Sequence, residues 1–240
     1  MSPPVEASPT PRSPPPEDER SQRVSPMSEK RTEITPHLEQ VLAPYWDEVD
    51  PLIVAIQEDL HRRQKVLMQI SREQVRFNAW ICRLIGARRV LEVGTYLGLS
   101  AVAFAQALPP EGHVDTVEIF EEHADIAEGW FRQGGLADRI TVHRGAALDV
   151  VPGLPGPYDL CFIDAAKRDN RALLDLCIDR TRSGGLILVD NAFRSGALGT
   201  DRADADDVGT IEALDFARTS DQLDSIVLPI ADGILACRRL

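Results

Sequence analysis

Short apolar runs and amphipathic segments alternate along most of this chain. The runs that predict buried strands lie at 89–93, 113–118, 139–143, 158–163 and 185–190. Segments with a helical spacing of apolar residues follow them, at 99–108, 121–133, 145–151, 169–181 and 208–219. Strands that are apolar on both faces are typical of a parallel sheet covered by helices. The alternation therefore predicts an α/β fold with right-handed crossovers between parallel strands.

The two ends of the chain add further elements to this core. Strands are expected at 225–229 and 233–238, joined across a turn at Asp232-Gly233 that favours a hairpin. The last strand is therefore expected to be antiparallel. Helical spacing predicts helices before the first strand, at 38–47, 51–69 and 73–84. We expect a doubly wound, seven-stranded, mainly parallel sheet with an antiparallel last strand and added N-terminal helices.

Residues 1–36 differ in composition from the rest of the chain. They contain nine prolines with interleaved serines and charges, and such a segment buries too little apolar surface to offset the entropy lost on ordering. They lack the apolar stretch of a signal peptide and the acid-free amphipathic pattern of a transit peptide. We therefore expect a disordered Pro-rich tail over 1–36 and one domain over 37–240.

The charge and cysteine content narrow the choice of partners and compartment. A net charge of −12 disfavours nucleic acid, because phosphate binding needs clustered Lys and Arg. No apolar run is long enough to cross a membrane. The four cysteines show no CxxC spacing, as expected of reduced thiols. We expect a cytoplasmic protein without nucleic-acid or membrane partners.

The first expected strand leads into a glycine turn. Arg89–Gly98 reads RVLEVGTYLG, and Gly94 and Gly98 let the backbone approach a ligand where the next helix begins. A dinucleotide fingerprint would read GxGxxG here, to admit a pyrophosphate. The chain has ExGxxxG, and the Glu92 carboxylate suits a ligand that carries a positive charge or an amino group. The alternative is a strand, turn and helix without a ligand.

A second acidic residue ends the next strand. Glu118 follows the glycine turn by about the distance at which nucleotide-binding α/β folds hold a ribose through its two hydroxyls. We therefore predict that Glu118 binds a ribose. The alternative is a solvated charge at a strand end.

Polar residues also follow the fourth and fifth expected strands. Asp164 ends one of these strands, and Asp190-Asn191 ends the other. Carboxyl ends of parallel strands meet at one edge of a sheet, and an oxygen-only ligand set suits Mg²⁺. The alternative is that both aspartates are helix N-caps. Lys167 lies three residues after Asp164, and a buried lysine beside a divalent cation can act as a general base. The alternative for it is a solvated lysine.

From Met68 onward the chain resembles a known family, the class I S-adenosylmethionine-dependent O-methyltransferases of the cation-dependent catechol and caffeoyl-coenzyme A type. The matching segments, in the family's order, are MQISREQ (68–74), LIGARRVLEVGTYLGLSA (84–101), GLADRITVHRGAALDVVPGL (135–154), FIDAAK (162–167), GGLILVDNAFRSG (184–196) and LPIADGILACRR (228–239). The resemblance implies a Rossmann-like fold. It also implies S-adenosylmethionine and Mg²⁺, or another divalent cation, as cofactors.

The resemblance also assigns roles to individual residues. Lys167 would be the catalytic base, and Asp164, Asp190 and Asn191 would bind the metal. Met68 would border the reacting methyl group. The cofactor-binding residues would be Met68, Ile70, Glu92, Gly94, Thr95, Tyr96, Ser100, Glu118, Ala147 and Asp164. The family further implies a homodimer that acts on a small-molecule hydroxyl acceptor.

Three departures from the family pattern concern the acceptor. Relatives usually read DADK where this chain has DAAK at 164–167, and they often have a tyrosine at Arg171 and a tryptophan at Arg194. All three changes make the local charge more positive. We infer an anionic or carrier-linked acceptor, with Arg171 and Arg194 as substrate-contacting residues. The alternative is that both arginines point into solvent.

Three classes of function stay open at this point. The first is a Mg²⁺-dependent O-methyltransferase, which the motifs favour. The second is a nucleotide-binding oxidoreductase, for which the chain lacks the GxGxxG turn. The third is a non-catalytic binding module with a methyltransferase fold, against which the presence of Lys167 and all three metal-binding positions argues.

Overall fold

The computed structural model describes residues 32–46, 50–64, 68–198, 200 and 204–240. Most of the expected tail, residues 1–31, lies outside the described residues. The chain divides into two units, 1–43 and 44–240, and the second contains the sheet and its helices. The domain boundary expected at residue 37 stays a prediction.

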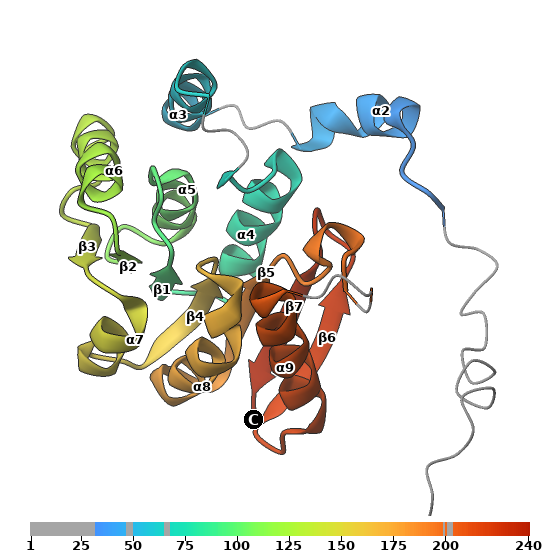
Figure 1. Cartoon of the computed structure of the whole chain (residues 1–240). Helices are drawn as coiled ribbons and strands as arrows, with labels where there is room; N and C mark the ends of the chain where they lie inside the picture. Colours follow the sequence, from blue (N-terminus) through green and yellow to red (C-terminus); the bar gives the residue numbers. More distant parts are fainter. Residues whose placement is uncertain (1–31, 47–49, 65–67, 199, 201–203) are drawn as a thin grey trace, which may run out of the picture. The chain divides into compact units, whose positions relative to one another are not determined.

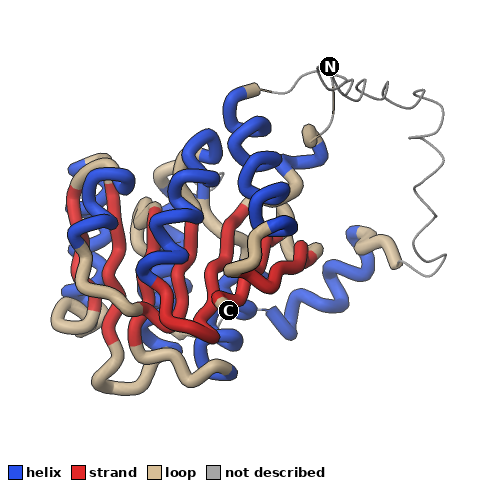
Figure 2. Tube along the Cα trace, turned by 90° about the horizontal axis from the view of Figure 1, so that it is seen from below, coloured by secondary structure: helices blue, strands red, loops and turns tan. Residues whose placement is uncertain are grey.

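A seven-stranded sheet forms the centre of the second unit (Figures 1 and 2). Its strands are β1 (Arg89–Val93), β2 (His113–Glu118), β3 (Ile140–Arg144), β4 (Tyr158–Ile163), β5 (Thr181–Asp190), β6 (Leu223–Leu228) and β7 (Ile234–Arg239). The order across the sheet is β3-β2-β1-β4-β5-β7-β6. Neighbouring strands from β1 to β5 pair in parallel, whereas β7 pairs antiparallel with both β5 and β6. The predicted doubly wound sheet with an antiparallel last strand is confirmed.

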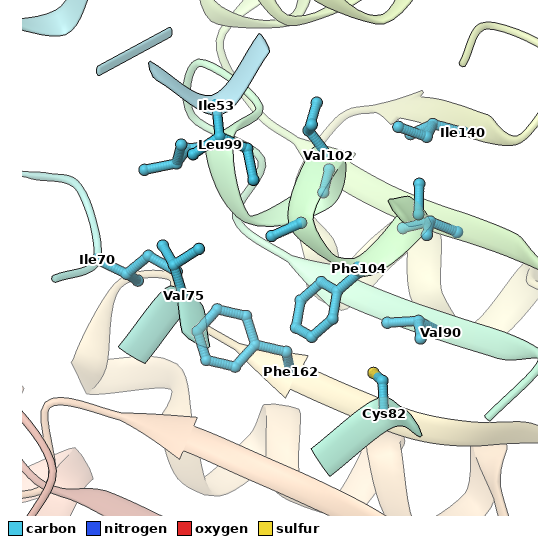
Figure 3. Packing of buried hydrophobic residues seen from close by; sticks show 14 of the residues in the cluster. Ile53, Ile70, Val75, Cys82, Val90, Leu99, Val102, Phe104, Ile140 and Phe162 are labelled. Carbon is cyan, nitrogen blue, oxygen red and sulfur yellow. The ribbon is translucent and has the colours of Figure 1, made fainter. Parts of the chain in front are cut away.

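Helices cover both faces of the sheet. One hydrophobic cluster joins it to α3 (Pro51–Arg62), α4 (Arg72–Leu84), α5 (Leu99–Ala107) and α6 (Glu121–Gln133). The cluster on the other face joins it to α7 (Ala147–Val150), α8 (Asn170–Arg180) and α9 (Ala205–Thr219). Alternate strand residues enter the two clusters, because successive side chains of a strand point to opposite faces. Figure 3 shows Phe104 of α5 beside Phe162 of β4 in the first cluster, with ring centroids 5.6 Å apart.

In the described part of the chain three helices precede β1, as predicted, but their lengths differ from the prediction. Helix α2 spans Pro36–Trp46, and α3 ends at Arg62 although the apolar spacing predicts a helix to Gln69. Gln64 has φ 57°, a left-handed conformation that a right-handed helix cannot continue through. Among the described residues, no helix has the length and apolar character needed to cross a membrane.

Two local differences from the prediction affect the loops at the sheet edge. Helix α9 begins at Ala205, not at residue 208, because Asp204 and Asp207 form a capping box at its start. Short 3-10 turns at Lys167–Asp169 and Arg194–Gly196 were not predicted. Both turns lie just after a strand, in segments that carry predicted site residues.

Candidate active site

The carboxyl ends of β1, β2, β4 and β5 border a cavity of about 800 Å³. Nine of the ten predicted cofactor-binding residues line it: Met68, Ile70, Gly94, Thr95, Tyr96, Ser100, Glu118, Ala147 and Asp164. Lys167, Asp190, Asn191 and Arg194 line it too, but Glu92 and Arg171 do not. The topology therefore brings predicted site residues that are up to 126 positions apart (68 to 194) around one space.

The glycine turn after β1 brings two loops into contact. Gly94 has φ 106°, and a Cβ on it would lie 2.1 Å from the backbone oxygen of Asp164. Its N–H donates to the carbonyl oxygen of Val117 at 3.0 Å, which ties the turn to β2. Only glycine fits this conformation and this close approach. The turn thereby holds the start of the Asp164 loop against the end of β1.

Glu118 ends β2 with its carboxylate at the cavity wall. Its Oε2 accepts a hydrogen bond from the Tyr96 N–H at 2.7 Å, and its Oε1 accepts one from the Phe120 N–H at 2.9 Å. Each carboxylate oxygen has two lone pairs, so both can still accept a hydroxyl proton. The two backbone bonds fix the carboxylate in an orientation that suits a pair of ribose hydroxyls.

Glu92, for which we expect a ligand role, lies below the surface of the cavity. Its side chain is 0% exposed, because it shares with Val90 the face of β1 that α5 covers. Its Oε2 accepts a hydrogen bond from the Thr116 hydroxyl at 2.5 Å. Burial raises the pKa of Glu92 to about 8, against the hydrogen bonds from Ser100 and Thr116. In this structure Glu92 contacts Thr116 and Ser100, and its role as a ligand stays a prediction.

Acidic groups lie close together where β4 and β5 reach the cavity. Lys167 Nζ donates to Asp164 Oδ1 at 2.6 Å, and the lysine is 8% exposed. The Asn191 N–H donates to Asp190 Oδ1 at 2.7 Å. Burial raises the pKa of Asp190 to about 7, and the Asp164 charge adds to this while Lys167 opposes it. Two carboxylates thus lie within electrostatic reach of each other, with the Lys167 side chain beside them.

This donor set fits a hard divalent cation. It offers carboxylate and amide oxygens without sulfur or imidazole, which is the preference of Mg²⁺. Burial and the nearby Asp164 charge disfavour ionisation of Asp190, and a cation bound between the two carboxylates would offset this. No cluster of three or more His, Cys, Asp or Glu residues suited to a metal occurs in the described part of the chain. Asp164, Asp190 and Asn191 together would form a mixed Asp and Asn site.

Sequence reasoning missed several residues of the cavity. Phe120 lines it while 59% exposed, and its ring lies 5.3 Å from that of His123. An apolar pair directly after the acidic end of β2 was the available signal. Asp232 also lines the cavity, and its Oδ1 accepts from the Ser195 N–H at 2.7 Å. The sequence pattern assigns Asp232 only to a turn.

The expectation for Arg171 is wrong. Its guanidinium lies over the Phe216 ring, 3.5 Å from the centroid, and pairs with Asp175 one helical turn along α8. The side chain is thus turned toward α9 and away from the cavity. Arg194 does line the cavity, but its Nε donates to Asp207 Oδ1 at 2.9 Å. Its positive charge is balanced by a carboxylate that is 3% exposed.

Comparison with known proteins agrees with this geometry. A family model described as O-methyltransferase matches residues 47–240. The chain is 36% identical over 180 residues to the catechol O-methyltransferase of Mycobacterium tuberculosis, covering 75% of this chain and 82% of that one. It also matches the crystal structure of cofactor-bound Rv0187 from MTB, with a TM-score of 0.79, 32% identity and coverage of 87% and 99%. The O-methyltransferase TomG from Streptomyces achromogenes, solved in complex with SAM, gives a TM-score of 0.77, 25% identity and coverage of 85% and 96%.

Proposed function

Because this chain belongs to the O-methyltransferase family, we propose that it moves a methyl group from S-adenosylmethionine to one hydroxyl of a small catechol-type acceptor, with Lys167 as the base and a divalent cation as a second cofactor. The family assignment makes the chain an S-adenosylmethionine-dependent O-methyltransferase. The metal, the base and the acceptor are the parts that we propose here.

One observation carries the proposal. A single cavity is lined by Glu118 and the glycine turn at one end and by Asp164, Lys167 and Asp190 at the other. Its volume of about 800 Å³ lies within the range of small-molecule and cofactor sites. The cofactor and a small acceptor can therefore bind side by side, with the methyl group between them.

The cofactor end is built to bind and orient. Glu118 would accept hydrogen bonds from the ribose hydroxyls, since its oxygens already have fixed positions. The rings of Phe120, His123 and Tyr96 form an aromatic wall nearby, with centroid separations of 4.9 and 5.3 Å. Such rings offer a flat apolar surface to a heteroaromatic base. Met68 would border the methyl group from the opposite side of the cavity.

The acceptor end is built to remove a proton. In the proposed reaction, Lys167 Nζ takes the proton of the acceptor hydroxyl, the oxygen bonds to the methyl carbon, and the sulfonium becomes a neutral thioether as the carbon–sulfur bond breaks. Asp164 fixes the position of the amine through the 2.6 Å hydrogen bond. A divalent cation bound by Asp164, Asp190 and Asn191 would lower the pKa of that hydroxyl.

The acceptor that we propose is an uncharged catechol-type compound. The similarity to a catechol O-methyltransferase supports an acceptor with two adjacent hydroxyls. The expectation of an anionic or carrier-linked acceptor depended on free arginine charges. Arg171 lies outside the cavity, and Arg194 is paired with Asp207, so neither offers an uncompensated positive charge to an anion.

We further propose a cytoplasmic homodimer. All four cysteines are free and buried, which suits a reducing compartment. The homodimer rests on the family resemblance, and sedimentation of the purified chain at several concentrations tests it. A mass of one chain, 26.5 kDa, at all concentrations would contradict it.

The catalytic proposal is tested by a methyl-transfer assay with catechol and S-adenosylmethionine. Treatment with EDTA should abolish turnover, and added Mg²⁺ should restore it. Lys167→Met should lower kcat by about 10²- to 10⁴-fold, the range for losing a general base, while S-adenosylhomocysteine binds as before. Full turnover after exhaustive chelation would exclude the metal, and an unchanged kcat in the lysine variant would exclude the base.

A further inference from the structure

The first turn of α9 contacts both loops of the acceptor end. Asp206 Oδ1 accepts from the Arg168 N–H at 3.1 Å and from Arg168 Nε at 3.0 Å, directly beside Lys167. Gly209 packs against the same segment so closely that a Cβ would lie 2.5 Å from the Lys167 carbonyl oxygen. Asp207 accepts from Arg194 Nε at 2.9 Å, in the loop that follows Asp190 and Asn191. One helical turn thus joins the lysine loop to the loop of the proposed metal ligands.

Asp207 is itself fixed on the helix. Its Oδ2 accepts from the Asp204 N–H at 3.2 Å, and its own N–H donates to Asp204 Oδ1 at 2.9 Å. The side chain is 3% exposed. A buried carboxylate that is hydrogen-bonded on both oxygens has a fixed orientation, and bonds to a charged partner are stronger than neutral ones. Arg194 is therefore bound to a carboxylate whose orientation is fixed.

The loop that carries Arg194, residues 191–196, has a strained backbone that other contacts must hold in place. Arg194 has φ 51° and Ser195 has φ 52°, and residues with side chains rarely adopt this left-handed region. Strained conformations persist only where the surrounding structure imposes them. The Ala192 and Phe193 N–H groups donate to the carbonyl oxygens of Gly233 and Asp232, and the Ser195 N–H donates to Asp232 Oδ1 at 2.7 Å, so these bonds hold the loop to the turn before β7. The bond from Arg194 to Asp207 ties it to α9.

We propose that Arg194 and Asp207 form a positioning pair for methyl transfer, which holds the loop 191–196 on α9 and so sets the separation between Lys167 and the Asp190–Asn191 side of the cavity. Arg194 acts through this loop and does not serve as the counter-ion of an acceptor. The inference rests on the proposed acceptor end described above. It explains why an arginine is compatible with a catechol-type site at a position where the family often has tryptophan.

The test uses three variants, which are Arg194→Gln, Asp207→Asn and the double variant that carries both changes. Each is compared with Arg218→Gln. Arg218 is a matched control, because it pairs with Asp215 at 3.1 Å on the same helix but is exposed and far along the chain from the loop. Rates are normalised to the active fraction found by titration with S-adenosylhomocysteine. Both single variants should lose about 10- to 100-fold in kcat, the scale of a small misplacement of reacting groups. The double variant should lose no more than about threefold beyond either single one, because the pair acts as a unit.

Two acceptors separate positioning from charge recognition. With catechol and 3,4-dihydroxybenzoate as probes, the ratio of their kcat/KM values should be unchanged in all variants. If Arg194 were a counter-ion, Arg194→Gln would lower kcat/KM for 3,4-dihydroxybenzoate relative to catechol. Asp207→Asn would raise the same ratio, because it frees the Arg194 charge. Shifts in these opposite directions would overturn the proposal.

Hydrogen exchange gives a readout that does not depend on activity. Backbone amides of residues 191–196 should exchange several-fold faster in Arg194→Gln and in Asp207→Asn than in Arg218→Gln. Unchanged exchange in this loop would overturn the positioning pair. The chelation experiment tests only the metal, whether or not turnover is lost. The proposed function and the positioning pair can therefore fail separately. If the native chain methylates neither probe, the proposed acceptor fails and the exchange comparison still decides the pair.

Discussion

Glu92 and Glu118 show how burial decides the role of a carboxylate. Each lies at or near the end of an apolar strand run, and their sequence contexts predict ligand contact for both. Glu118 lines the cavity and is fixed by two backbone N–H groups. Glu92 is fully buried, and its pKa is raised to about 8, so that it is mainly protonated at neutral pH. Glu118 is placed at the cavity surface, whereas Glu92 contacts Thr116 and Ser100 beneath it, and the ligand roles of both stay predictions.

Glu118→Gln should weaken binding of S-adenosylhomocysteine by about 10- to 100-fold, since a hydrogen bond to a charged group contributes about 1.5–3 kcal/mol. The amide would also turn a donor toward one of the two backbone N–H groups. Titration calorimetry measures the effect. Glu111→Gln is a suitable control, because Glu111 pairs with Arg88 on the surface, and equal losses in both variants would remove Glu118 from the site.

Glu92→Gln should change how stability depends on pH. The folded-state pKa of Glu92 is raised, so the folded chain binds more protons than the unfolded chain between the ordinary value of 4.5 and about 8. The contribution of Glu92 to the free energy of unfolding is therefore complete below pH 4.5 and is lost as the pH rises through about 8. The variant lacks this loss, so its Tm should match the native one near pH 5 and exceed it near pH 9. A Tm difference that stays constant with pH would contradict the raised pKa.

At the scale of the element, the turn from β1 into α5 places the two ends of the cavity against each other. Gly94 approaches the Asp164 backbone, and Gly98 begins α5 with φ 89° under the Phe131 ring. The sequence spacing of the glycines identifies the turn. The contact with β4 arises only because β4 lies beside β1 in the sheet.

Gly94→Ala should abolish cofactor binding, because its Cβ would overlap the Asp164 carbonyl and the backbone is left-handed there. Gly129→Ala is the matched control. Gly129 lies within α6 and a Cβ there meets nothing within 4 Å, so alanine should raise stability by up to about 1 kcal/mol. Thermal unfolding with and without S-adenosylhomocysteine measures both effects. A ligand-induced shift of normal size in Gly94→Ala would show that the turn is not part of the site.

At the scale of the whole molecule, the ends of four strands and the loops that follow them share one cavity. Parallel strands place all their carboxyl ends at one edge, and the order β2-β1-β4-β5 puts the cofactor end beside the acceptor end. Hydrophobic clusters on both faces hold the sheet in place. Ligand binding at this edge is therefore linked to the stability of the whole unit.

S-adenosylhomocysteine at 100 times its Kd should stabilise the chain by about 2.7 kcal/mol, a rise in Tm of about 5–10 °C for a domain of this size. NADH at the same concentration should leave the Tm unchanged, because the turn lacks the glycines that admit a pyrophosphate. Differential scanning fluorimetry compares the two ligands. Stabilisation by NADH alone would favour an oxidoreductase over a methyltransferase.

The sequence by itself determined the order of strands and helices, the glycine turn, and the positions of Glu118, Asp164 and Asp190 at strand ends. These follow from local periodicity and from the rule that parallel strands end at one edge. It did not locate the capping box that starts α9 at Ala205 or the contribution of Phe120 to the cavity.

Only the tertiary structure decided what each charged side chain meets. Arg171 and Arg194 look alike in sequence, yet Arg171 stacks on Phe216 and Arg194 pairs with Asp207. Glu92 is buried because α5 covers its face of β1. Electrostatic partners depend on distances between segments far apart in the chain, which periodicity does not contain. The chemistry of the site is therefore readable from strand ends, but the balance of its charges is set by packing.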